Sequence, residues 1–202
     1  VKSKGRGISL AQEKHVFIEK LIQDTSIPDT NKSYFLTLCN GARLPTDNKN
    51  LALTVLDDLV KQLDKRGIPF DISGKPADSA EIAVIRHNIE GLLAEKNEEE
   101  YADKQAAEWE EIAAYMDLIT NPRRTKTLSN GDEIKVPQAE VPAYFEWVIW
   151  RAFLAIDSLT NKPYEARRFK IDQDFLPIGT APGNGPDLIF EFNDFVLVVE
   201  VT

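Results

Sequence analysis

Two apolar segments near the end of the chain constrain the fold more than any other feature of the sequence. Leu188–Phe192 and Phe195–Val199 are rich in aromatic and β-branched residues, which favour β-strands. Between them stand Asn193 and Asp194, two residue types that tolerate the left-handed backbone of a tight turn. The sequence therefore predicts an antiparallel hairpin with a two-residue turn.

The two faces of this hairpin differ in polarity, because side chains alternate between faces along a strand. One face has only apolar side chains and is predicted to lie in the core: Leu188, Phe190, Phe192, Phe195, Leu197, Val199 and Val201. The other face places Asp187 opposite Glu200 at one end. Two carboxylates about 5 Å apart repel each other by about 3 kcal/mol when the effective dielectric constant is about 20. Such a pair is tolerated in water, shares one proton, or binds a cation.

A third carboxylate precedes the hairpin on a predicted helix. Residues 144–157 have a helical pattern that follows Pro142, and residues three or four apart in it form one apolar stripe. Glu146 lies in line with that stripe: Glu146, Ile149, Trp150, Phe153 and Leu154. A charged side chain is seldom buried without a partner. Glu146 therefore either belongs to a polar site or complements the helix dipole in the first turn.

A helix Glu, an Asp at the start of one strand and a Glu at the end of the next together describe a site for a hard cation. Carboxylate oxygens with open coordination positions suit Mg²⁺. Such an ion polarises a phosphoryl oxygen and lowers the pKa of a bound water, as phosphodiester hydrolysis requires.

At these residues the chain resembles a known group of nucleases, the AlwI-like type IIS restriction and nicking endonucleases of the PD-(D/E)XK superfamily. Thr202 stands where most of the superfamily has Lys, and the AlwI-like subfamily lacks that Lys. The resemblance is specific over residues 144–202, and residues 1–140 show only compatible helical character. The motifs that carry it are Phe145-Glu-Trp147, Gly183-Asn184-x-Pro186-Asp187, Asp194-Phe195 and Glu200-Val-Thr202.

The resemblance implies that Glu146, Asp187 and Glu200 are the Mg²⁺-binding catalytic acids. It also implies a double-stranded DNA substrate, recognised by a region outside this chain, and a further functional acid after the last motif. Cleavage of both strands would need a dimer or a second subunit, because one active centre cuts one strand at a time. We expect the chain to be part of a longer protein, truncated at both ends, and to be inactive on DNA by itself.

The whole sequence predicts an α+β protein with two parts. Residues 1–140 form a helical linker or support region, and residues 141–202 form an incomplete restriction-endonuclease-like α/β core. Helices are predicted from Ser9 to Asp24, from Asn48 or Asn50 to Arg66, from Asp78 or Ser79 to about Lys96, and from Glu99 to Ile119. The acidic run at 95–100 is predicted to be a helix junction, and Asn130-Gly131 to turn a hairpin.

Composition limits the classes of protein that remain. The formal net charge is −9, and residues 78–120, with twelve acidic and three basic side chains, account for all of it. Such a segment is a solvated helix face or, less simply, a mimic of DNA charge that regulates cleavage. The single cysteine, Cys39, excludes an internal disulfide, and a cytoplasmic protein without a membrane span is the simplest interpretation.

Two other functions remain open at this point. A repair nuclease or junction resolvase would use the same fold on a different DNA. A helical interaction module with an inactive nuclease fold would explain the missing Lys, but not the presence of all three acids.

Overall fold

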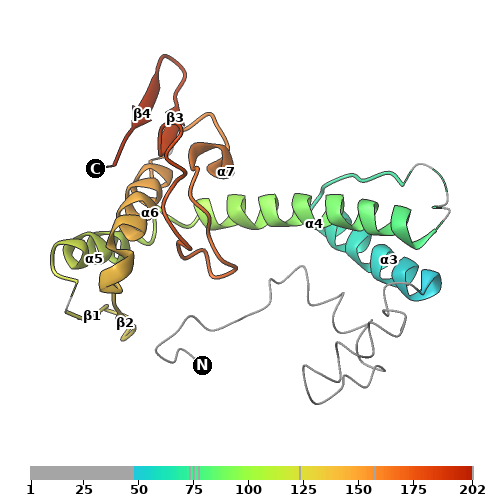
Figure 1. The fold of residues 1–202 in the computed structure, drawn as a ribbon, viewed down its shortest axis with the longest axis horizontal. Coiled ribbons are helices and arrows are strands. Elements are labelled where there is room, and N and C mark those ends of the chain that lie inside the picture. Colours follow the sequence, from blue (N-terminus) through green and yellow to red (C-terminus); the bar gives the residue numbers. More distant parts are fainter. Residues whose placement is uncertain are drawn as a thin grey trace. The chain divides into compact units, whose positions relative to one another are not determined.

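The computed structural model describes residues 48–201, apart from residues 73, 75, 77, 123 and 157. The chain forms two compact units, Val1–Ala94 and Glu95–Thr202. The described residues contain five α-helices and two small two-stranded antiparallel sheets (Figure 1). The predicted α+β class is thus confirmed, with helix predominating. The predicted helix from Ser9 to Asp24 and Cys39 lie outside the described residues.

In the first unit, helix α3 (Lys49–Lys65) packs with the start of helix α4 (Ser79–Ala102). Both helices begin at predicted capping residues. The Asn48 side chain accepts hydrogen bonds from two backbone N–H groups of the first turn of α3, and Asp78 does the same for α4. Gly67, at φ 71°, follows the end of α3 as predicted. The buried apolar residues of this unit are Ala52, Val55, Leu56, Leu59, Leu63, Ile82, Ile89 and Leu93.

The junction predicted at residues 95–100 is wrong. Helix α4 continues to Ala102, and the chain turns at residues 103–108 before helix α5 (Trp109–Thr120). Residues 95–100 stay helical because Glu and Lys have high helix propensity and because two acids of this run have cationic partners. Glu98 pairs with Arg167, and Glu99 with Lys162. The predicted end at Asn121-Pro122 is confirmed, since Asn121 caps α5.

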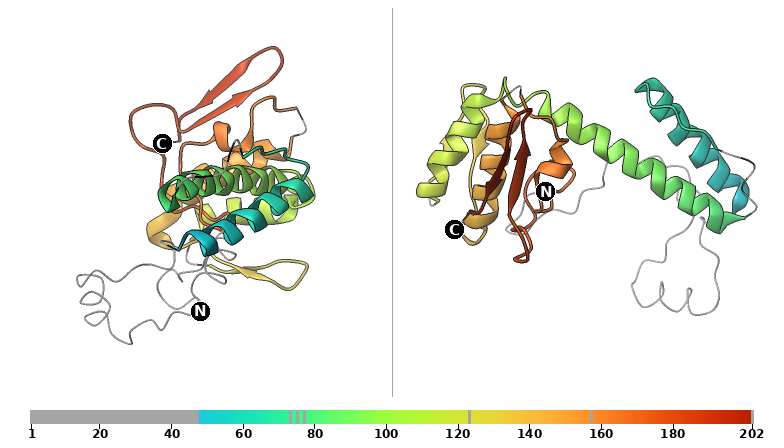
Figure 2. Two further views of the ribbon diagram at one scale, coloured as in Figure 1. Left: turned by 90° about the vertical axis from the view of Figure 1, so that its right-hand side faces the viewer. Right: turned by 90° about the horizontal axis from the view of Figure 1, so that it is seen from above.

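The second unit is built around helix α6 (Val141–Leu154), which is preceded by a short 3-10 helix, η2 (Gln138–Glu140). Helix α6 lies between α5 and the hairpin of strands β3 (Leu188–Glu191) and β4 (Val196–Val199) (Figures 1 and 2). Phe153 stacks on Phe190 at a ring-centroid distance of 4.2 Å, whereas Trp147 meets Tyr115 edge-on at 4.9 Å. Helix α6 therefore buries side chains on two sides, not only on the predicted stripe.

The β3–β4 hairpin has the predicted register. Leu188 pairs with Val199 and Phe190 with Leu197, and the Phe192 N–H donates to the Phe195 carbonyl across the two-residue turn at 2.9 Å. The predicted core face is confirmed near the base of the hairpin, where Leu188 and Phe190 are fully buried. At the tip it is not, because Phe195 is 58% exposed even though its ring stacks on that of Phe192.

The second edge of β3 is covered by the segment that contains helix α7 (Pro163–Ala166). The Thr160 N–H donates to the Glu191 carbonyl at 2.8 Å. The Asn161 side chain bonds the backbone of β3 twice, donating to Ile189 O at 2.9 Å and accepting from Glu191 N at 3.1 Å. Further along, Arg167 forms an isolated β-bridge with Leu188. Both edges of β3 are therefore occupied.

A smaller hairpin, β1 (Lys126–Thr127) with β2 (Glu133–Ile134), joins α5 to η2. It turns at the predicted Asn130-Gly131, with Gly131 at φ 89°. The Asp132 carbonyl accepts from the Leu128 N–H at 2.9 Å, so the loop has three residues, 129–131.

Candidate active site

Glu146 lies in the second turn of α6, because the helix begins at Val141 rather than at Tyr144. Its side chain is only 4% exposed, and its Oε2 accepts a hydrogen bond from the Ala181 backbone N–H at 2.7 Å. The prediction that Glu146 faces the buried side of the helix is confirmed. A carboxylate in this position does more than complement the helix dipole, since it joins α6 to the loop that leads into β3.

Asp187 immediately precedes β3 and is held on both sides. Its N–H donates to the Val199 carbonyl at 3.2 Å, and its carbonyl accepts from the Arg168 N–H at 3.2 Å. Its carboxylate Oδ2 accepts from the Val201 N–H at 2.8 Å. The Asp187 side chain is 9% exposed, so the carboxylate is fixed and largely shielded from water.

Glu146 and Asp187 share one electrostatic environment. Burial is the main reason that the pKa of the Glu146 carboxyl is raised above its usual range. The hydrogen bond from Ala181 opposes this rise in pKa, and the negative charge of Asp187 adds to it. The structure thus brings two of the three predicted acids together, in a place where a bound cation would stabilise both charged forms.

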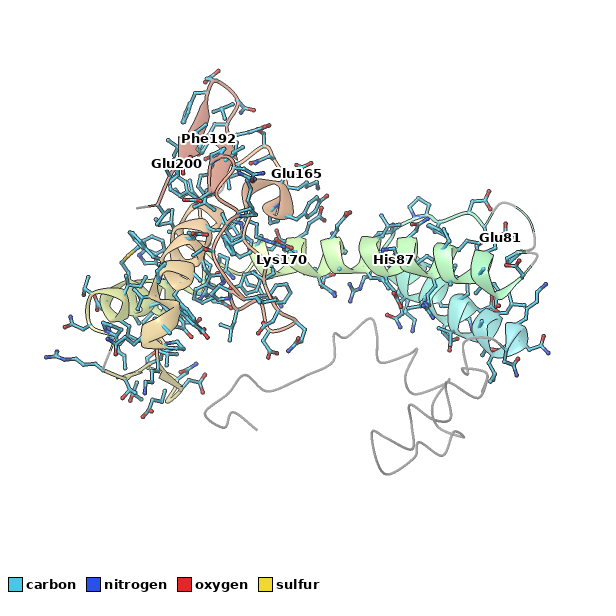
Figure 3. All side chains as sticks on the ribbon, viewed as in Figure 1. Glu81, His87, Glu165, Lys170, Phe192 and Glu200 are labelled. Atoms are coloured by element: carbon cyan, nitrogen blue, oxygen red, sulfur yellow. The ribbon has the colours of Figure 1, made fainter. Side chains whose placement is uncertain are left out.

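Glu200 follows the end of β4, and its side chain is exposed (Figure 3). Its two neighbours, Val199 and Val201, both bond to Asp187, so the backbone of Glu200 lies next to that residue. Even so, the described part of residues 48–201 contains no metal-binding group of three or more side chains of Asp, Glu, His or Cys. The predicted convergence of three carboxylates is therefore seen only as a pair.

The residues present fit a divalent cation in their chemistry. Glu146 and Asp187 offer oxygen ligands of the kind that Mg²⁺ prefers, and the burial that raises the pKa of Glu146 also strengthens its attraction to a cation. Glu200 would complete a set of three carboxylates if its side chain turned toward Asp187.

A buried arginine that the sequence reasoning missed anchors the helix that carries Glu146. Arg151 is 1% exposed, and its guanidinium donates to Gln105 Oε1 at 2.6 Å, Glu111 Oε1 at 2.6 Å and Glu108 Oε2 at 2.7 Å. The same group lies over the Trp147 ring at 4.7 Å. These contacts tie α6 to α5 and to the turn before it.

A second arginine with a buried partner is Arg167, which follows helix α7. Arg167 forms a bidentate pair with Glu98, with both N–O distances at 2.6 Å, and donates to the Phe169 carbonyl. Glu98 is 5% exposed, so at least part of the acidic segment is not a solvated helix face. Its charge is used inside the second unit to hold α4 to the chain before β3.

Comparison with known families agrees with the motifs. The family model described as AlwI restriction endonuclease matches residues 1–202. The chain belongs to the AlwI restriction endonuclease family. The resemblance stated from the sequence is thus confirmed, and the AlwI family match extends over residues 1–140, where the motifs gave no specific signal.

A search of curated proteins gave no match. Membership of the AlwI family suggests a restriction endonuclease, which is a DNA-binding deoxyribonuclease. In the described part of the chain, no helix is long and apolar enough to cross a membrane.

Proposed function

We propose that this chain carries the cleavage region of a Mg²⁺-dependent type IIS restriction or nicking endonuclease, which hydrolyses phosphodiester bonds of double-stranded DNA. The observation that carries the proposal is the buried, electrostatically coupled pair of Glu146 and Asp187. Membership of the AlwI family supports DNA as the substrate. The restriction-endonuclease-like core, with α6 packed on the β3–β4 hairpin, is part of the same proposal.

Glu146 and Asp187 are the residues that would hold Mg²⁺, with Glu200 as the third carboxylate. When bound, the ion would polarise a phosphoryl oxygen and lower the pKa of a water molecule. The chain's own contribution is to keep the two acids in place through the N–H groups of Ala181 and Val201. Burial of both acids also removes competing water, which strengthens electrostatic interactions inside the site.

Glu200 has a different part in this proposal. Because its side chain is exposed, it can contact the DNA directly, whereas Glu146 and Asp187 would act through the metal ion that they hold. Its backbone lies beside Asp187, and in this proposal its side chain reaches the metal by rotation about its own bonds.

DNA recognition is assigned to a region outside this chain, and a dimer or second subunit to cleavage of the second strand. The acidic segment does not oppose DNA binding as a whole, because several of its acids are paired within the second unit. These pairs are Glu98 with Arg167, Glu99 with Lys162, and Glu108 and Glu111 with Arg151.

The test uses the intact natural protein and the variants Glu146→Gln, Asp187→Asn and Glu200→Gln. Each variant should lose cleavage of supercoiled plasmid while DNA binding in a gel-shift assay is retained. Glu191→Gln is the matched control, since Glu191 is an exposed acid on β3, and it should cleave like the wild type. Retained cleavage in Glu146→Gln or Asp187→Asn would refute the assignment.

The same proteins also distinguish the restriction enzyme from the alternative functions. Cutting at one fixed position relative to a short sequence supports the restriction enzyme, whereas cutting of branched DNA without sequence preference would favour a repair nuclease or resolvase. If the wild type neither cuts DNA nor binds Mn²⁺ in a calorimetric titration, the chain is an inactive interaction module.

A further inference from the structure

The Arg168 side chain lies across the residues that lead into Asp187. Its Nη2 donates to Asn184 Oδ1 at 2.7 Å, and its Nη1 donates to the Pro186 carbonyl at 3.3 Å. The backbone of the same residue donates to the Asp187 carbonyl at 3.2 Å. Arg168 thus binds the loop before Asp187 through its side chain and binds Asp187 through its backbone N–H.

The loop leaves room for this guanidinium. A Cβ atom added at Gly185 would lie 2.3 Å from Arg168 Nη1, which is closer than real contacts allow, and 3.2 Å from Arg168 Cζ, which is a tight contact. A larger residue at position 185 would therefore displace the Arg168 side chain. The missing side chain at Gly185 leaves the space in which the guanidinium reaches Asn184 and Pro186.

We propose that Arg168 is a positioning residue that fixes the loop 183–186 and, through it, the carboxylate of Asp187 for metal binding. The inference rests on the proposed function, in which Asp187 is a metal ligand. Arg168 would act like the outer-shell residues of known metal sites, which hydrogen-bond to a metal ligand and hold it in place. Loss of such a residue weakens metal affinity or activity by about 10- to 100-fold.

The sign of the effect on metal affinity distinguishes positioning from simple charge. A guanidinium close to a cation site repels the cation, so its removal should tighten metal binding if Arg168 contributes only charge. If Arg168 orients Asp187, its removal should weaken metal binding in spite of the lost repulsion. Asn184 is neutral, and its removal changes the loop without changing the charge.

The experiment is a double-mutant cycle on the intact natural protein, with Mn²⁺ affinity measured by calorimetry. Arg168→Ala and Asn184→Ala should each weaken Mn²⁺ binding by about tenfold, the lower end of the outer-shell range. The double variant should also be about tenfold weaker, not a hundredfold, because Asn184 acts on the loop through its hydrogen bond with Arg168, and Arg168→Ala already removes that bond. Lys170→Ala, which removes an exposed charge on the same connection (Figure 3), should leave the affinity unchanged.

Two outcomes overturn the inference while the proposed function stands. One is wild-type Mn²⁺ affinity in both single variants, and the other is tighter binding in Arg168→Ala with no change in Asn184→Ala. A wild-type protein that binds no Mn²⁺ overturns the proposed function instead. Far-ultraviolet circular dichroism shows whether each variant is folded; if Arg168→Ala is not, Arg168→Lys replaces it, with weaker Mn²⁺ binding expected because one ammonium group cannot bridge both acceptors.

Discussion

Replacing Arg151 by Met should strongly destabilise the unit of residues 95–202. Almost no other single substitution of a charged residue in this unit should cost as much. Met fills much of the volume of the arginine stem but offers no donors. The change removes the hydrogen bonds to Gln105, Glu108 and Glu111, and the contact with the Trp147 ring. Helix α6 would then lose the polar contacts of Arg151 with α5 and with the turn before it.

The expected loss comes mainly from the group left behind in the core. Gln105 is fully buried, and its Oε1 without a donor costs about 1–3 kcal/mol. The side chains of Glu108 and Glu111 are 36% and 33% exposed, so water can solvate them, and each lost ion pair counts for about 0.2–1 kcal/mol. Together these terms give about 3 kcal/mol, at the lower end of the cost of breaking a buried ion pair.

Tryptophan fluorescence during urea unfolding measures this loss, because the three tryptophans, Trp109, Trp147 and Trp150, all lie in the second unit. With a urea slope of about 2 kcal/mol per molar, the midpoint of Arg151→Met should fall by about 1.5 M. Arg124→Met, at an exposed position of the same unit, should shift it by less than about 0.3 M. Equal midpoints for the two variants would refute the reasoning.

Two further predictions concern stability. The pKa of Glu146 is raised in the folded protein, so its carboxyl stabilises the fold below the unfolded pKa, and this contribution is lost as the pH rises through the folded pKa. Glu146→Gln should therefore be more stable than the wild type at about pH 8 without divalent metal, and this advantage should disappear by about pH 4. Urea unfolding midpoints of both proteins at the two pH values test this. A difference in midpoint that does not change with pH would contradict it. Gly131 has φ 89° with open space around its Cα, so Gly131→Ala should cost about 1–2 kcal/mol through backbone strain alone. Thermal unfolding of the two proteins checks this, and an unchanged midpoint would mean that the β1–β2 turn relaxes without cost.

Features with local causes could be predicted from the sequence. Asn48 and Asp78 cap helices because their side chains bond N–H groups two and three residues ahead. The β3–β4 register follows from alternation and a two-residue turn, which leave one pairing that keeps Leu188 and Phe190 in the core. In these places the interacting groups are neighbours in sequence or are related by a fixed period.

Features with distant causes could not be predicted. Arg151 finds its partners 40 to 46 residues away, and Arg167 finds Glu98 at a separation of 69 residues. In the sequence these acids belong to a charged run that is typical of a solvated helix. Because the Glu98–Arg167 pair is made inside the second unit, α4 continues to Ala102, beyond the predicted junction.

The residues of the candidate site also differ in how far the sequence alone could place them. Glu146 lies on a helix, so the spacing of the apolar stripe was enough to place it on the buried side. Asp187 begins a strand and has backbone partners in the next one. Glu200 comes directly after β4, and it continues the alternation of exposed and half-buried residues of that strand. Its exposure agrees with the alternation of β4, in which Val196 and Val198 are exposed as well, but the alternation did not predict that its side chain would stay apart from the Glu146–Asp187 pair.

The covered edge of β3 determines how this sheet can grow. Thr160, Asn161 and Arg167 occupy the side of β3 that does not face β4, so in the described part of the chain the only edge open to another strand is that of β4. Widening can then proceed in one direction only. Each added strand would leave Asp187 further from the new border, and an acid near the margin of a two-stranded hairpin would become an interior residue of a larger sheet.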